Sequence, residues 1–188
     1  MRNLTRVAVL CLCIHALFCI SFSQVQSPVD LGKRVLTWNE AVDKWIAEFP
    51  GKPAPDFEFT QSSGDHYRLT DLGDRLILLD FWASWCWVCI EDIPKLKKVR
   101  DDYAGRIVLI GINHDVKNAW TQDSLATFVK KTGLTWPQVL DAERPLLTDK
   151  YGTKFYPSYI VVRSGRIIAC HWKIDEIRSI LDQELKRQ

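Results

Sequence analysis

A continuous apolar run from Arg75 to Trp82 (RLILLDFW) constrains the fold more than any other part of the sequence. One acid, Asp80, interrupts the run, and the pattern is typical of a central strand that is buried on both faces of a sheet. A helix is expected over 87–103, with a kink at Pro94, and a second buried strand over 107–112. Buried parallel strands that alternate with helices predict an α/β layer fold, in which helices flank a central mixed β-sheet.

Shorter elements complete the predicted order. They are an amphipathic helix over 36–49, two strands over 57–60 and 67–69, a helix over 124–131, two strands over 159–163 and 166–171, and a final helix over 174–185. The helices are predicted from apolar residues spaced three and four apart. Each of the two pairs of strands surrounds a turn segment and predicts a hairpin. Gly133 is expected to stop the helix before it.

The first residues have the pattern of an export signal. Arg2 and Arg6 precede an apolar run over 7–22, and Ser21 to Ser23 offer small residues at the positions that a signal peptidase recognises. The apolar run has 16 residues, whereas a membrane-spanning helix needs about 20. We therefore expect cleavage after Ser23, with a retained membrane anchor as the alternative.

The chain divides into three parts on this interpretation. They are a signal peptide over 1–23, an N-terminal extension over 24–50 that holds the first helix, and a main domain over 51–188. The segment from Pro50 to Pro55 is rich in Pro and Gly and marks the boundary of the main domain. A lipoprotein is disfavoured because Phe18, rather than a small residue, precedes Cys19.

Removal of the signal changes both the charge and the cysteine content. The chain has 25 Lys and Arg against 23 Asp and Glu, and the loss of Arg2 and Arg6 leaves 23 of each. A chain near zero net charge has no overall attraction to nucleic acid or to an anionic membrane. Three of the six cysteines remain, namely Cys86, Cys89 and Cys170, which are too few for a disulfide-stabilised scaffold.

Cys86 and Cys89 lie where the central strand is expected to turn into the following helix. The first cysteine is at the helix N-terminus, where unpaired N–H groups and the helix dipole favour a thiolate. The second lies about one turn along the helix, close enough to form a disulfide with the first. Such a pair can attack a substrate disulfide, form a mixed disulfide and resolve it internally. In an exported chain this setting predicts thiol–disulfide redox chemistry.

Three other uses of the pair are weaker. A zinc site needs four ligands, and the sequence offers no second Cys pair and no pair of histidines at helical spacing. Haem attachment needs a histidine after Cys89, where Ile90 stands. A purely structural disulfide stays open, although it would close a very small loop and add little stability.

The segment around the pair resembles the active-site segment of thioredoxins, Leu79-Asp80-Phe81-Trp82-Ala83-Ser84-Trp85-Cys86-Trp87-Val88-Cys89. Three further motifs resemble the exported, redoxin-related TlpA/ResA-like branch of that superfamily: Ala54-Pro55-Asp56-Phe57, Asp92-Ile93-Pro94 and Tyr156-Pro157-Ser158. The resemblance runs from about Pro53 to Arg166 and then covers the last helix. It implies a thioredoxin fold and a thiol–disulfide oxidoreductase.

The resemblance also implies catalytic roles. Cys86 would be the nucleophile and Cys89 the resolving thiol, and Asp80 matches a buried acid beneath the second cysteine. Burial disfavours the charged form of an acid and so raises its pKa. Asp80 could then take the proton of Cys89 as this thiol attacks the mixed disulfide. A structural acid, satisfied by backbone or water, is the alternative for Asp80.

The resemblance also implies a substrate groove beside the cysteines. The residues along it would be Trp85, Trp87, Val88, Tyr156 and Pro157. Pro157 matches the proline that is cis in this fold. From the residues alone a trans turn proline stays open, because only about 5–6% of X–Pro bonds are cis. Trp87 and Val88 stand where Gly-Pro or similar pairs are commoner, and Trp87 either contacts the partner or packs against the protein.

Several other residues have their own expectations. Asp92 stands where the TlpA/ResA-like pattern usually has Glu, and it either tunes the cysteines or is a solvated acid on the helix face. Phe155, where many relatives have Gly, is expected to narrow the groove. Cys170 lies in an apolar strand and is expected to be buried and inert. The remaining polar candidates, His66, His114 and Asp115, are expected in loops.

The predicted function is the reduction of protein disulfides in the periplasm or another extracytoplasmic compartment. Asp80 and Asp92 near the thiols would raise the thiol pKa values and favour a reductant, and the Trp-Val bridge carries no cationic group. No metal and no cofactor beyond the Cys86–Cys89 disulfide is expected. The resemblance suggests substrates such as apocytochrome c and a membrane thiol carrier as electron donor. We expect a monomer without affinity for nucleic acid.

Two other functions stay open. A thiol peroxidase of the redoxin type shares the Ala-Pro-Asp-Phe motif, but such enzymes place Pro and Thr before the reactive cysteine, where this chain has Asp80 to Trp85. A non-enzymatic binding module would keep the fold and hold Cys86–Cys89 as a permanent disulfide.

Overall fold

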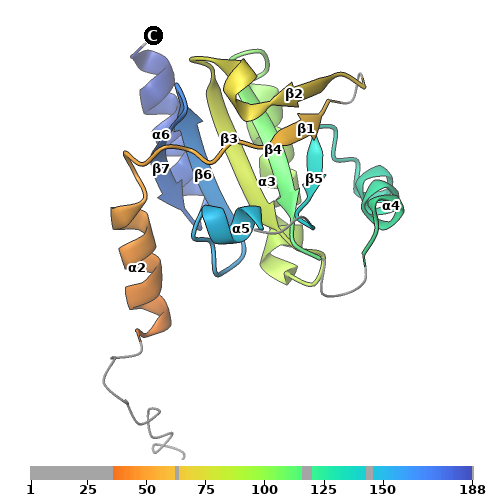
Figure 1. Ribbon diagram of the computed structural model, residues 1–188, viewed down its shortest axis with the longest axis horizontal. Coiled ribbons are helices and arrows are strands. Elements are labelled where there is room, and N and C mark those ends of the chain that lie inside the picture. Colours follow the sequence, from red (N-terminus) through yellow and green to blue (C-terminus); the bar gives the residue numbers. More distant parts are fainter. Residues whose placement is uncertain (1–35, 62–63, 116–119, 143–145, 188) are drawn as a thin grey trace, which may run out of the picture. The chain divides into compact units, whose positions relative to one another are not determined.

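The central sheet has five strands in the order β5–β4–β3–β6–β7 (Figure 1). They are β3 (Leu76–Trp82), β4 (Ile107–Asn113), β5 (Gln138–Leu140), β6 (Ser158–Arg163) and β7 (Arg166–His171). β3 pairs with β4 and β4 with β5 in parallel, whereas β3–β6 and β6–β7 are antiparallel. The predicted α/β fold with a central mixed sheet is therefore confirmed. The computed structural model describes residues 36–61, 64–115, 120–142 and 146–187.

β3 is the middle strand, and all seven of its residues are buried. Its alternating side chains enter two separate clusters of apolar residues. Ile77, Leu79 and Phe81 belong to one cluster, and Leu76, Leu78 and Trp82 belong to the other, which also contains Cys86 and Cys89. Because layers cover both faces of the sheet, the strand reads as a continuous apolar run rather than an alternating one.

Three helices contribute to the cluster that contains the cysteines. They are α3 (Trp87–Asp102), α4 (Gln122–Thr132) and α6 (Ile174–Lys186). α3 contributes Leu96 and Val99 to the cluster, and α6 contributes Ile177 and Leu181. Figure 1 shows α3 and α6 behind the sheet. α3 runs through Pro94, and the kink there stays a prediction.

The opposite face is covered by short elements from three parts of the chain. They are α2 (Trp38–Glu48), the antiparallel hairpin of β1 (Glu58–Thr60) and β2 (His66–Arg68), the 3-10 helix η1 (Leu69–Leu72) and α5 (Leu147–Lys150). The Trp45 indole N–H donates to the Tyr151 carbonyl oxygen at 3.1 Å, and the Tyr151 hydroxyl donates to the Pro55 carbonyl oxygen at 2.7 Å. These two bonds connect α2 and the segment before β1 to the chain that follows α5.

Every helix and strand expected from the sequence is present, with ends that differ by at most two residues. Gly133 has a φ of 66° and ends α4 in the left-handed conformation that glycine adopts without strain. The expectations omitted β5, η1 and α5. These elements have three or four residues each, too few for apolar periodicity to reveal them.

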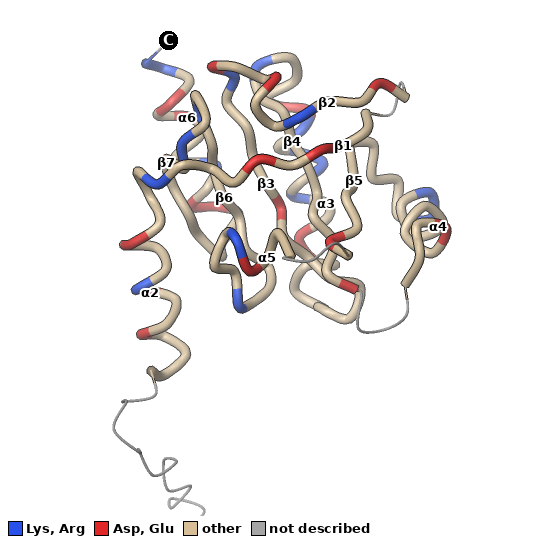
Figure 2. The backbone as a smooth tube through the Cα atoms, in the orientation of Figure 1, with Lys and Arg blue, Asp and Glu red and all other residues tan. Residues whose placement is uncertain are grey.

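Most of the predicted N-terminal organisation cannot be compared with the structure. The signal peptide over 1–23, the cleavage after Ser23 and most of the extension over 24–50 lie outside the described residues. Within the part that the structure does describe, no helix has the length and apolar character needed to cross a membrane. Figure 2 shows acidic and basic residues interspersed along the described elements.

Candidate functional site

The two cysteines lie at the start of α3 and form a disulfide, with their Cα atoms 5.3 Å apart. Cys86 is the N-cap residue of the helix, and its sulfur accepts a hydrogen bond from the backbone N–H of Cys89 at 3.2 Å. Both residues are buried. The sulfur of Cys86 therefore accepts a hydrogen bond from an N–H group at the helix N-terminus. This arrangement stabilises a thiolate once the disulfide is reduced.

Asp80 lies in the middle of β3 with 4% of its surface exposed. Because side chains alternate along a strand, it faces the same side as Leu78 and Trp82, which pack in one cluster with Cys86 and Cys89. Its Oδ1 atom has no hydrogen-bond partner among the described residues. Burial, followed by the charge of Asp92, raises the pKa of Asp80 to about 8. The expected buried acid near the cysteines is thus present, without a hydrogen bond on that oxygen.

Asp92 is buried rather than solvated, although it lies on a surface helix. The Tyr159 hydroxyl donates to its Oδ2 atom at 3.0 Å, and the Lys95 ammonium lies 3.0 Å from its Oδ1 atom. Tyr159 is also the residue directly opposite Asp80 in the β3–β6 ladder. The interpretation of Asp92 as a solvated acid is therefore wrong, because the helix face that carries it packs against β6.

The aromatic residues expected in the groove surround the cysteine loop. Trp85 and Trp87 are 57% and 68% exposed, and the Trp85 ring meets the Tyr156 ring edge-on at 5.6 Å between centroids. The Tyr156–Pro157 peptide bond is cis, as the resemblance implies. Most of the Trp87 ring is therefore exposed to solvent, and its contact with a partner stays a prediction. Val88 is half-buried.

Phe155 does not occupy the position expected of it. The side chain is 6% exposed, and its ring meets the rings of Trp38 and Trp45 edge-on at 5.0 and 5.1 Å between centroids. The expectation that Phe155 narrows the groove is therefore wrong, because α2 provides an apolar surface that buries the ring. The sequence around Phe155 carries no signal of this long-range contact.

The loop after β4 contributes two residues whose role the sequence analysis missed. The His114 ring stacks on Tyr156 at 5.5 Å between centroids. Asp115 is fully buried and accepts hydrogen bonds from the backbone N–H and the hydroxyl of Ser84, at 2.8 and 2.9 Å. Both residues are in a loop, as expected. His114 packs against the groove residue Tyr156, and Asp115 fixes the loop before Cys86 through its bonds to Ser84.

A signal for these contacts exists in the order of the strands. The carboxyl ends of neighbouring parallel strands meet at one edge of a sheet, so the loops after β3 and β4 must lie close together. His114 also lies 3.7 Å from Asp141, whose carboxylate accepts the backbone N–H groups of Leu147 and Thr148 at the start of α5. His66, in contrast, is the first residue of β2, so the expectation of a loop is wrong for it.

Cys170 is a free cysteine with 2% of its surface exposed. Burial raises the pKa of its thiol to about 12. The expectation that this cysteine is buried is confirmed, and its high pKa keeps it in the unreactive thiol form at neutral pH.

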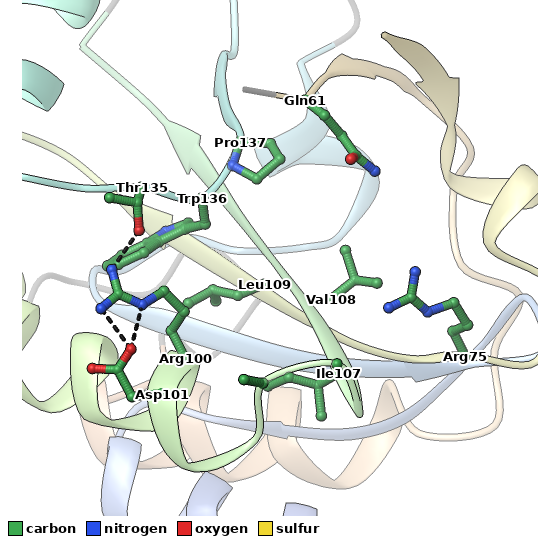
Figure 3. A pocket seen from close by; sticks show the side chains of 12 residues that line it. Gln61, Arg75, Arg100, Asp101, Ile107, Val108, Leu109, Thr135, Trp136 and Pro137 are labelled. Carbon is green, nitrogen blue, oxygen red and sulfur yellow. Dashed lines mark hydrogen bonds and ion pairs between the residues drawn. The ribbon is translucent and has the colours of Figure 1, made fainter. Parts of the chain in front are cut away.

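No group of three His, Cys, Asp or Glu side chains in the described ranges is arranged to hold a metal ion. A surface cavity of about 430 Å³ lies between the end of α3 and the start of β4, lined by residues such as Arg100, Ile107 and Trp136 (Figure 3). Arg100 comes 11 residues after Cys89, which places it about 17 Å away along the helix. This cavity is therefore separate from the cysteine site.

Comparisons of the sequence identify one family and a set of named relatives. The profile of the AhpC/TSA family matches residues 50–176. The thioredoxin-like protein YneN of Bacillus subtilis is 29% identical over 122 residues, which is 64% of this chain and 70% of the relative. The thiol–disulfide oxidoreductase ResA of Bacillus anthracis is 27% identical over 120 residues, or 63% of this chain and 66% of the relative. The chain thus spans about two thirds of the length of these relatives.

Solved structures agree on the fold. A putative protein disulfide isomerase from Bacteroides thetaiotaomicron has a TM-score of 0.60 and 27% identity, and the match covers 73% of this chain and 88% of that one. A putative thiol:disulfide interchange protein DsbE from Chlorobium tepidum has a TM-score of 0.60 and 23% identity over 73% and 96% of the two chains. The expected thioredoxin fold is confirmed.

Proposed function

The chain is an oxidoreductase of the AhpC/TSA family, within the thioredoxin superfamily, and we propose that it reduces protein disulfides outside the cytoplasm through Cys86 and Cys89. The observation that carries the proposal is the position of Cys86 at the N-cap of α3, where its sulfur accepts the Cys89 N–H. A reduced Cys86 at this position is stabilised as a thiolate and is the stronger nucleophile of the two.

The reaction needs two steps at the cysteines. The Cys86 thiolate attacks one sulfur of the substrate disulfide, and the electron pair of the broken S–S bond leaves on the other substrate sulfur, which takes up a proton. Cys89 then loses its proton and attacks the Cys86 sulfur, and the first substrate sulfur departs with the electron pair of the mixed disulfide and takes up the second proton. The substrate gains two electrons and two protons, and the protein is left with its Cys86–Cys89 disulfide.

Asp80 is the proposed proton acceptor in the second step. It is buried on the side of the sheet that carries the cysteines, and its pKa of about 8 lies close to neutral pH. A general base works best when its pKa is near the working pH, because it is then ionised often enough and still binds the proton well. The unpartnered Oδ1 atom is available to the Cys89 proton.

The direction of the reaction is proposed from charge. Asp80 and Asp92 are buried acids close to the cysteine cluster, and each opposes the formation of a thiolate whenever it is ionised. Trp87 and Val88 between the cysteines carry no positive charge that would offset this effect. A less stable dithiolate makes the disulfide easier to form, so the reduced protein donates electrons readily.

Protein disulfides are the proposed substrates. The exposed rings of Trp85 and Trp87 beside the cysteines offer apolar contact area to a polypeptide rather than a pocket for a small molecule. The relative named thiol–disulfide oxidoreductase ResA supports protein disulfides as substrates, and we propose oxidised cell-envelope proteins such as apocytochrome c. A membrane thiol carrier would return the two electrons, and we propose a monomer that does not bind nucleic acid.

Export is part of the proposal. The signal peptide over 1–23, the extension over 24–50 and the domain over 51–188 are the proposed organisation, with an uncleaved membrane anchor as the alternative. N-terminal sequencing of the protein recovered from the producing cells tests the cleavage after Ser23. An intact residue 1 on a membrane-bound protein would favour the anchor.

Reduction of insulin by dithiothreitol in the presence of the protein tests the central proposal. The wild type should accelerate insulin precipitation, the C86S variant should lose the acceleration, and the C89A variant should accumulate a mixed disulfide. The C170S variant is the matched control and should match the wild type. Equal rates for wild type and C86S would overturn the proposal, and consumption of hydrogen peroxide by the reduced protein would favour a peroxidase instead.

A further inference from the structure

We propose that Lys95 is a positioning residue that decides which of two buried carboxyl groups carries a proton. Its ammonium group keeps Asp92 ionised, so the acidic proton of the pair is held on Asp80, and Asp80 accepts the Cys89 proton in those molecules in which it is ionised. The inference rests on the proposed function, because it assigns a residue that adjusts the acid of that same site.

The two acids lie in one buried cluster of groups between β3, β6 and α3. Tyr159 faces Asp80 directly across the β3–β6 ladder, and its hydroxyl donates to Asp92 Oδ2 at 3.0 Å. Asp80 and Asp92 are 4% and 6% exposed. Two like charges that share a buried site repel each other while both lack hydration, so ionisation of one acid opposes ionisation of the other.

The hydrogen bonds favour the charge on Asp92. One oxygen of Asp92 accepts the Tyr159 hydroxyl, and the other lies 3.0 Å from the Lys95 ammonium. Asp80, in contrast, has an Oδ1 atom without any partner among the described residues. A carboxylate is stabilised by donors and by a nearby positive charge, whereas a neutral carboxyl tolerates burial better. The arrangement therefore fits an ionised Asp92 and a protonated Asp80.

The position of Lys95 makes it the group that sets this division. It lies one turn after Asp92 on α3, and half of its side chain is exposed, so the ammonium stays hydrated while it reaches the buried carboxylate. Asp175 at the start of α6 lies 3.6 Å from the same ammonium but is itself 75% exposed, and water screens its charge.

The other ionisable groups that face the pair do not replace Lys95. Cys86 at the N-cap of α3 and Cys89 in its first turn form a disulfide in this structure and do not titrate. Burial raises the pKa of Tyr159 on β6 well above its ordinary value, so its hydroxyl remains a neutral donor. Among the described residues, Lys95 is the positive group that contacts Asp92.

Loss of the Lys95 charge should move the proton. Asp92 would then lack its positive partner and hold the proton of the pair, and a neutral Asp92 would no longer oppose the ionisation of Asp80. The acidic proton would shift from Asp80, next to the cysteines, towards Asp92. Because the two acids are coupled, the change appears as opposite movements of their titration midpoints.

The experiment follows the carboxyl carbons of Asp80 and Asp92 by NMR as a function of pH in the disulfide form, with D80N and D92N for assignment. In the wild type Asp80 should titrate near pH 8. In K95M the Asp80 midpoint should fall below neutral pH, because the pair then holds its shared proton on Asp92. K95R should restore the wild-type titration, since it keeps the charge.

K98M is the matched control, because Lys98 is an exposed α3 lysine whose ion-pair partner is Asp102 at 3.4 Å. It should leave both midpoints unchanged. Unchanged midpoints in K95M, or a change that K95R fails to reverse, would overturn the inference. The titration does not depend on catalysis, so a protein that fails to reduce insulin but shows the shift would refute the proposed function alone. If the wild type reduces insulin, C86S does not, and K95M leaves the midpoints unchanged, only the role of Lys95 is refuted.

Discussion

Tyr159 and Asp80 lie directly opposite each other in the antiparallel ladder between β6 and β3, and the Tyr159 hydroxyl donates to the carboxylate of Asp92 on α3. The side chain of Tyr159 thus contacts Asp92, while its backbone pairs with β3, the strand that carries Asp80. This relationship places two buried acids, from segments 12 residues apart in sequence, on the side of the sheet that carries the cysteine pair. Because the two acids are buried near each other, the ionisation of one affects the ionisation of the other.

The D80N variant should be more stable than the wild type at neutral pH. Burial raises the pKa of Asp80 from its ordinary 3.8 to about 8, so between these pH values the unfolded chain has released a proton that the folded protein keeps. The contribution of Asp80 to stability is therefore largest below about pH 4 and is lost as pH rises to about 8. D80N should gain a few kcal/mol at neutral pH.

Urea unfolding of the disulfide form at several pH values checks this. The stability difference between D80N and the wild type should grow with rising pH and vanish in acid. A difference that is the same at all pH values would show that Asp80 is not protonated in the folded protein at neutral pH.

The W87A variant should bind protein substrates less well and keep its fold. Trp87 is 68% exposed, and substitutions on the surface usually change stability by less than about 0.5 kcal/mol. An exposed aromatic ring next to the nucleophile adds contact area for a polypeptide. We expect a higher KM for a protein disulfide and an unchanged rate with a small aromatic disulfide. W172A, at another partly exposed tryptophan, is the control, and an equal effect of both substitutions would argue against a substrate contact.

The D115N variant should loosen the loop before the cysteines. Asp115 accepts the N–H and the hydroxyl of Ser84 and the side-chain N–H of Asn113, and an amide cannot accept all of these bonds. An unsatisfied buried group costs about 1–3 kcal/mol, and hydrogen exchange at the Ser84 amide should become faster. D74N, in an exposed turn, should leave both properties unchanged. Exchange at Ser84 as slow as in the wild type would mean that Asp115 does not hold this loop.

Cys170 should resist alkylation in the folded protein. It is 2% exposed, and burial raises the pKa of its thiol to about 12, whereas alkylation needs an accessible thiolate. After reduction, iodoacetamide should modify Cys86 first and Cys170 only in denaturant, as mass spectrometry of the peptides would show. Rapid labelling of Cys170 without denaturant would contradict its burial.

The fold could be predicted largely from the sequence because its centre has strong local signals. The run from Arg75 to Trp82 and the apolar spacing of the long helices each indicate one type of element. The short β5 and α5 could not be found in this way, since three or four residues form a strand or a helical turn only where the surrounding chain supplies partners. α5, for example, begins where the Asp141 carboxylate accepts two backbone N–H groups.

The sequence by itself determined the cysteine pair, its position at a strand-to-helix junction and the presence of an acid in the central strand, because these depend on neighbours in the chain. Only the tertiary structure decided that Asp92 is buried, that Trp87 is exposed and that Phe155 turns towards α2. Each of these outcomes depends on which distant element covers the residue, namely β6 for Asp92 and α2 for Phe155. Local pattern does not encode such contacts, since they arise when segments far apart in sequence pack together.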